Sequence, residues 1–138
     1  ERAEDIEQQG DFERKHLGRI DQSIAMGALF TANHMDVEAI VALTESGSTA
    51  LWMSRHNIHV PIFGVTSSTN SERRMALYRN VRPILMDAHS DRDAALVDAE
   101  RLLVARGVLM PGDTYAITCG EPMGYPGGTN MLKVCRVG

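Results

Sequence analysis

The chain has 138 residues, which is the size of one domain, and its hydrophobic fraction of 43% is normal for a globular protein. A net charge of −4, with no basic run, argues against binding to nucleic acid. The two cysteines form no Cys-x-x-Cys pair, no signal peptide is visible and no apolar stretch is long enough to cross a membrane, so we expect a cytoplasmic protein without a membrane partner.

The first stretch of the chain is charged and interrupted by glycines, so we expect residues 1–20 to be a linker or arm and residues 21–138 to be the domain. The chain opens without Met, which suggests a piece of a longer polypeptide. From Asp21 onward, apolar residues at three- and four-residue spacing predict a helix with one apolar stripe. The stripe consists of Ile24, Ala25, Ala28, Leu29 and Ala32. An apolar run at 39–43 then predicts a buried strand.

This strand leads into a loop of hydroxyl groups and one glycine, residues 44–49, here called the hydroxyl loop. A loop between a strand and a helix presents free backbone N–H groups and the positive end of the helix dipole, and phosphate groups suit that position. Ser and Thr are also ordinary helix N-caps, so capping alone is the alternative explanation. The candidate phosphate-binding residues are Thr44, Ser46, Gly47, Ser48 and Thr49.

The rest of the chain alternates helices and strands. Helices are expected at 50–56, from a cap at Thr69 to Tyr78, and from Ser90 to Gly107, the last being the longest. Strands are expected at 62–66, 81–86, 114–119 and 131–137. Pro83 has no N–H for a strand ladder, so the strand at 81–86 should lie at an edge of the sheet or begin at Pro83.

Repeated strand–helix units predict a three-layer α/β/α fold around a five-stranded, mostly parallel sheet. The last two strands are joined only by a loop rich in Gly and Pro, residues 120–129, here called the glycine loop, so the last strand should be antiparallel. The expected strand order is 3-2-1-4-5, which reverses between the first and fourth strands. Ligands bind at such switch points, beyond the carboxyl ends of the strands. We therefore expect the hydroxyl loop and the glycine loop to lie together and form one site.

Seven stretches of the chain carry a resemblance to a known family: residues 21–28, 43–50, 61–66, 77–83, 106–107, 111–113 and 128–130. In these stretches the sequence resembles the C-terminal domain of pyruvate kinases, most closely the bacterial type activated by AMP and sugar monophosphates. The resemblance implies a domain that performs no chemistry: it binds a phosphorylated effector and helps to assemble a homotetramer. The parent enzyme of glycolysis transfers phosphate from phosphoenolpyruvate to ADP in a preceding barrel that carries its Mg²⁺ and K⁺ sites. In this chain we expect no catalytic residue, metal or cofactor, and no activity in isolation.

The resemblance places the effector phosphate in the hydroxyl loop and closes the glycine loop over its sugar. The candidates in the glycine loop are Gly120, Gly124, Gly127, Gly128 and Thr129. Two departures matter: relatives activated by fructose 1,6-bisphosphate usually have a basic residue near Glu45, and several relatives, including AMP-activated ones, have Arg where Ser48 stands. Because the loop then lacks a cation, a bisphosphate activator is not expected. A purely structural assembly domain with a vestigial loop is the alternative.

Other candidates have simpler interpretations. Residues 66–71 are similar to the phosphate loop of flavodoxins, which makes a stand-alone flavin or nucleotide binder a third hypothesis, but helix capping explains them. Arg73 and Arg74 are assigned to a solvated face, and His89 has no partner at a useful spacing. The stripe of the first helix and the last strand are the expected contact surfaces between subunits.

Overall fold

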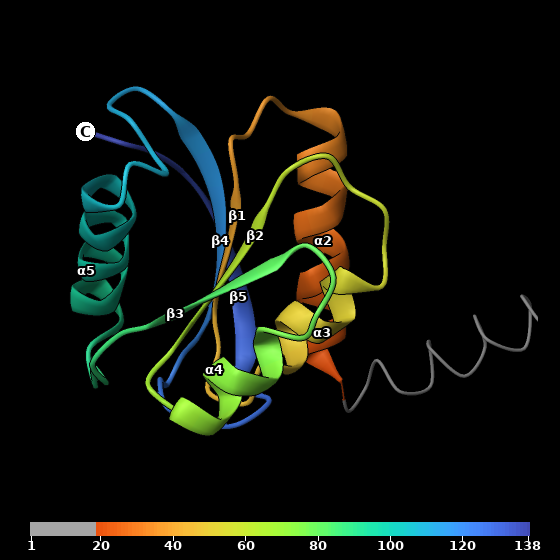
Figure 1. Ribbon diagram of the computed structural model, residues 1–138, viewed down its shortest axis with the longest axis vertical. Helices are drawn as coiled ribbons and strands as arrows, with labels where there is room; N and C mark the ends of the chain where they lie inside the picture. The colour runs from red at the N-terminus through yellow and green to blue at the C-terminus, as the bar shows by residue number, and fades with distance from the viewer. Residues whose placement is uncertain (1–18) are drawn as a thin grey trace, which may run out of the picture.

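The computed structural model describes residues 19–138, so the arm expected at residues 1–20 lies almost wholly outside the described part. Helices and strands alternate along this part until the last two strands (Figure 1). The elements are α2 (Ile20–His34), β1 (Ile40–Leu43), α3 (Ser48–Ser54), β2 (Ile62–Thr66), α4 (Thr69–Met75), β3 (Val81–Leu85), α5 (Arg92–Ala105), β4 (Thr114–Gly120) and β5 (Thr129–Arg136).

The strands form one five-stranded sheet in the order β3-β2-β1-β4-β5, which confirms the predicted topology. All neighbours are parallel except β4 and β5, which are antiparallel. The strand that contains Pro83 lies at one edge, where a residue without an N–H is tolerated. The chain changes direction across the sheet between β1 and β4, so the carboxyl ends of these two strands flank the switch point.

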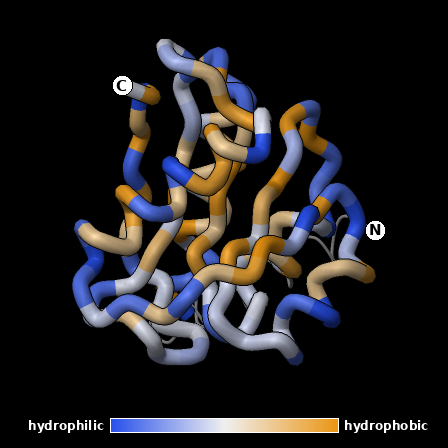
Figure 2. Tube along the Cα trace, turned by 60° about the vertical axis from the view of Figure 1, so that its left-hand side comes forward, coloured by the Kyte–Doolittle hydropathy of each residue, from blue (hydrophilic) through white to orange (hydrophobic). Residues whose placement is uncertain are grey.

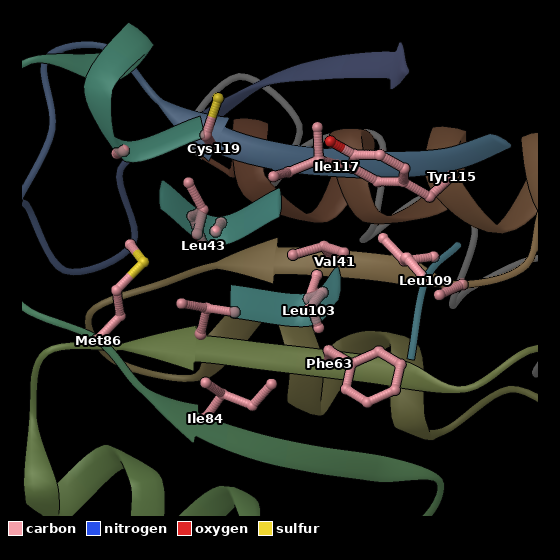
Figure 3. Close-up of a cluster of buried hydrophobic side chains, with 14 of the residues drawn as sticks. Val41, Leu43, Phe63, Ile84, Met86, Leu103, Leu109, Tyr115, Ile117 and Cys119 are labelled. Carbon is pink, nitrogen blue, oxygen red and sulfur yellow. The ribbon is translucent and has the colours of Figure 1, made fainter. Parts of the chain in front are cut away.

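Helices cover both faces of the sheet: α5 lies on one side, and α2 and α3 on the other (Figure 1). All four residues of β1 are buried, and successive side chains enter different cores. Val41 and Leu43 join the cluster beneath α5, where Leu103 is fully buried (Figure 3). Ile40 and Ala42 join the cluster beneath α2 and α3. This burial on both faces explains why β1 is a continuous apolar run rather than an alternating one.

The hydropathy of the trace follows this layering, with apolar stretches gathered in the middle of the molecule and hydrophilic ones mostly at its periphery (Figure 2). The apolar stripe expected on the first helix belongs to the domain core: Ala25, Ala28 and Leu29 are buried against the sheet. These three residues of the stripe are therefore not available for a contact between subunits. Within residues 19–138, none of the helices is both long enough and apolar enough to cross a membrane.

Helix ends differ from the expected positions by small steps. The side chain of Ser68, not Thr69, caps α4 by accepting a hydrogen bond from Ser71 N (3.2 Å), and α4 ends at Met75 rather than Tyr78. Asp91, not Ser90, caps α5. When two neighbouring residues can both cap, only the tertiary structure selects one. The longest described helix is α2, with 15 residues against 14 in α5. Gly107 follows α5 with φ +74°, as predicted for a left-handed C-terminal residue.

Candidate functional site

The hydroxyl loop and the glycine loop meet at the carboxyl edge of the sheet. The clearest link is a buried hydrogen bond of 2.9 Å, in which Thr49 Oγ1 donates to Thr129 Oγ1. Gly120 and Thr129, which were expected in the loop, are the ends of β4 and β5 and pair with each other next to an irregularity in the ladder. The topology thus brings together two segments that lie 80 residues apart in the sequence.

The hydroxyl loop is held by its own side chains. Gly47, at the start of α3, has φ +81°, and its N–H donates to Thr44 Oγ1 (3.0 Å). The N–H of Ser48 donates to Ser46 Oγ (3.2 Å). Two of the four N–H groups that the start of a helix leaves without intrahelical partners are therefore satisfied within the loop. An incoming anion would have to compete with these hydroxyl groups for the backbone donors.

Two carboxylates lie beside the hydroxyl loop. Asp21, at the start of α2, is only 4% exposed and accepts a hydrogen bond from Ser48 Oγ at 3.3 Å. Its other oxygen accepts hydrogen bonds from Arg19 Nε (3.3 Å) and the backbone N–H of residue 22 (3.0 Å). Both carboxylate oxygens of Glu45 lie 2.9 Å from Ser67 Oγ, so this side chain is turned toward the loop between β2 and α4. Each carboxylate therefore already has a partner inside the domain.

A cation does reach the hydroxyl loop, and it comes from α4. Arg74 Nη2 donates to the carbonyl of Ser46 (3.4 Å) and to Ser71 Oγ (3.1 Å). The buried Ser71 in turn donates through its hydroxyl group to the carbonyl of Glu45. Residues 44–49 themselves contain no cation, as expected, but the guanidinium of Arg74 from another element lies beside them. Arg74 is exposed, as a solvated face requires, but it also contacts the loop.

A pocket of about 190 Å³, here called the switch-point pocket, lies between the two loops. Of the predicted site residues, it is lined by Thr44, Gly120, Gly124, Gly127, Gly128 and Thr129. The remaining predicted residues are outside the lining, and Thr49 is joined to it only through its bond to Thr129.

Another part of the pocket wall was not predicted from the sequence. It consists of residues 86–89, which follow β3, together with Ser67. His89 belongs to this wall, and its Nε2 lies 2.9 Å from Asp98 Oδ2, so the prediction that it has no partner is wrong. The rule that ligands gather beyond the carboxyl ends of parallel strands would have included residues 86–89. Glu45 and Asp87 also line the pocket, and their carboxylates repel a strongly anionic group inside it.

Glycines shape the loop that covers the pocket. Gly124 and Gly127 have φ +90° and +69°, which residues with a Cβ rarely adopt. A Cβ at Gly120 would lie 2.6 Å from the carbonyl oxygen of Gly128, so the glycine loop can approach the end of β4 only because Gly120 has no side chain. Asn130 closes the base of the loop through two hydrogen bonds with the backbone of Glu121 (2.8 and 2.9 Å).

Two titratable groups of the core, Tyr115 and Cys119, are not among the residues that line this pocket. Burial, together with a 2.7 Å hydrogen bond to Glu100, raises the pKa of Tyr115 above its ordinary value. Burial also raises the pKa of the Cys119 thiol, which favours the unreactive protonated form. Both cysteines are free. Within residues 19–138, no group of three or more His, Cys, Asp or Glu side chains is placed to hold a metal ion.

Comparison with known proteins supplies the family. Residues 22–135 match the family model for "Pyruvate kinase, alpha/beta domain". The chain is 40% identical over 119 residues to a pyruvate kinase of Buchnera aphidicola subsp. Baizongia pistaciae, and 38% identical over 119 residues to pyruvate kinase II of Salmonella typhimurium; each match covers 86% of this chain and 25% of the relative. It is 39% identical over 116 residues to a pyruvate kinase of Staphylococcus epidermidis, which covers 84% of this chain and 20% of the relative. The chain thus spans a quarter or less of the length of these curated relatives.

Proposed function

Because this chain belongs to the pyruvate kinase alpha/beta domain family, we propose that it is the regulatory and assembly domain of an enzyme that transfers phosphate from phosphoenolpyruvate to ADP. In this proposal the domain performs no chemistry. It binds one phosphorylated metabolite, a sugar monophosphate or AMP, where the hydroxyl loop and the glycine loop meet. The observation that carries the proposal is the buried Thr49–Thr129 hydrogen bond, which joins both loops around the switch-point pocket.

The chemistry of this site favours one phosphate group on a polar body. Hydroxyl and N–H donors of the hydroxyl loop suit phosphate oxygens. The pocket beside them offers carboxylates, which accept hydrogen bonds from the hydroxyl groups of a sugar but repel a second phosphate. A monophosphate is therefore the preferred class, and fructose 1,6-bisphosphate should bind weakly.

Calorimetric titration of the chain with glucose 6-phosphate, ribose 5-phosphate and AMP tests this proposal. A binding heat with one of them, lost in Ser46→Asp, is the expected result, because the new carboxylate repels the phosphate in the loop. The matched control is Asn57→Asp. It adds the same charge at an exposed residue between α3 and β2, before the amino end of β2 and thus away from the carboxyl ends of the strands. Equal loss of binding in both variants, or no heat with any ligand in the parent chain, would refute an effector site.

A structural domain with a vestigial loop is the second candidate. One observation favours it: the N–H groups of Gly47 and Ser48 are already satisfied by side chains of the same loop. Asp21 also occupies the hydroxyl group of Ser48. If the loop serves only to start α3, these hydrogen bonds have a structural role alone, and the calorimetric titration should show no binding heat.

For assembly, we propose contacts between copies through the exposed apolar residues of α2 and the free edge of β5. Phe30 is 64% exposed on α2, with Ile20 and Met26 on the same helix, and Val134 is exposed on β5. Burial of such side chains stabilises an interface because it removes apolar surface from water. Light scattering should show an oligomer that Phe30→Glu dissociates. A monomer in the parent chain would contradict this part of the proposal.

A further inference from the structure

We propose that Arg74 supplies the positive charge for phosphate at the hydroxyl loop and so determines the specificity of the site for a phosphomonoester. This inference rests on the proposed effector site and adds to it a residue from another element. Arg74 lies on α4, after β2, whereas the hydroxyl loop follows β1. The sequence of the loop alone does not contain this cation.

The position of the Arg74 side chain is set by one contact with the loop and one with Ser71 of its own helix. Its Nη2 donates to the carbonyl of Ser46 and to Ser71 Oγ, at 3.4 and 3.1 Å. Ser71 is 1% exposed and its hydroxyl group is bonded to the carbonyl of Glu45, so α4 and the loop are tied together at two neighbouring residues. A guanidinium has five N–H donors, and both bonds use Nη2. The donors on Nε and Nη1 can therefore contact a ligand while Nη2 keeps its anchor.

The charge of Arg74 has no protein counter-ion in the part of the chain from residue 19 onward. The ion pairs found there involve Arg19, Arg92, Arg101 and His89. The two acids closest to the loop have other partners: Asp21 pairs with Arg19, and Glu45 is bonded to Ser67. An unpaired guanidinium beside a loop of hydroxyl groups is suited to a phosphate, because hydrogen bonds between Arg and phosphate are short, charge-assisted and often bidentate.

The neighbouring arginine provides a contrast on the same helix. Arg74 lies three residues after Ser71, so both side chains project from one face of α4 toward the loop. Arg73 is exposed one position earlier, about 100° around the helix, and makes none of the loop contacts. The two residues have equal charge and similar exposure, so they differ mainly in access to the loop.

The test compares Arg74→Gln, Arg74→Lys and the control Arg73→Gln by calorimetric titration with ribose 5-phosphate and with inorganic phosphate. Loss of one charge-assisted hydrogen bond to phosphate should weaken binding about tenfold in Arg74→Gln. Arg74→Lys should bind with intermediate affinity, because it keeps the charge but loses the forked geometry. Arg73→Gln should stay within about twofold of the parent chain. A thermal unfolding midpoint confirms that each variant is folded.

The outcomes separate this inference from the proposed function. If the parent chain binds ribose 5-phosphate and Arg74→Gln binds it equally well, Arg74 is not part of the site although the effector site stands. If Arg73→Gln loses as much affinity as Arg74→Gln, the effect is one of general charge and the assignment to Arg74 falls. If the parent chain binds neither ligand, both the effector site and the role of Arg74 are refuted. The NMR signal of the Arg74 Nε–H should shift on addition of phosphate, and an unchanged signal at saturation also contradicts the inference.

Discussion

Replacing Gly47 by alanine tests how the hydroxyl loop is held. Gly47 has φ +81°, a left-handed conformation that costs a residue with a Cβ about 1–2 kcal/mol. The new Cβ would also lie 3.0 Å from Met75 Cγ, and crowding in a packed core costs about 1–3 kcal/mol. Because the methionine side chain can shift slightly, we take the lower end of the second range. The free energy of unfolding of Gly47→Ala should therefore fall by about 2–3 kcal/mol.

Two further glycines separate the two contributions. Gly107 has φ +74°, and no atom lies within 4 Å of the position that a Cβ would take, so Gly107→Ala should show only the conformational cost of about 1–2 kcal/mol. Gly64 lies in β2 without a positive φ, and a Cβ there would overlap Met75 Sδ, so Gly64→Ala should show only crowding.

Urea unfolding followed by circular dichroism measures all three variants, and equal m-values show that they share one unfolding transition. The free energy of unfolding should decrease more in Gly47→Ala than in Gly107→Ala. Equal losses would show that Met75 does not confine the loop. A loss well below about 1 kcal/mol in Gly47→Ala would show that the left-handed conformation is not required.

Three other predictions follow from the core and from the site. Leu103→Ala should lower the free energy of unfolding by about 2–5 kcal/mol, measured by urea unfolding, because the Leu103 side chain of α5 is fully buried in the core. The raised pKa of Tyr115 means that the unfolded chain loses this proton first as pH rises above about 10. Above this pH the free energy of unfolding should therefore decrease more steeply in the parent chain and in the exposed control Tyr125→Phe than in Tyr115→Phe. Asp21→Asn should strengthen phosphate binding about fivefold in calorimetry, and the exposed control Asp36→Asn should not.

The sheet order could be predicted from the sequence because its signals are local. Continuous apolar runs mark buried parallel strands, and the short connection between β4 and β5 excludes a parallel crossover. Pro83 then identifies an edge strand without any knowledge of its neighbours. The meeting of the two loops follows from this topology alone, since both lie beyond the carboxyl ends of strands at the switch point.

The contacts within the site could not be predicted because they depend on side chains from other elements. Arg74 reaches the carbonyl of Ser46 across 28 residues, and Asp21 reaches Ser48 across 27. His89 finds its partner on the following helix. No periodicity or motif encodes such pairs, since they arise only when α2, α4 and α5 are packed on the sheet. For the same reason, the sequence did not reveal that Ser68, rather than its neighbour Thr69, caps α4.

A titration of the ¹⁵N-labelled chain with ribose 5-phosphate, followed by two-dimensional NMR, tests the central claim most directly. The account predicts that the amide signals of Gly47, Ser48 and Thr49 shift together with those of Gly127, Gly128 and Thr129, along one saturating curve. Shifts confined to one loop, shifts at another surface, or no shift at millimolar ligand would contradict a phosphate site formed jointly by the two loops.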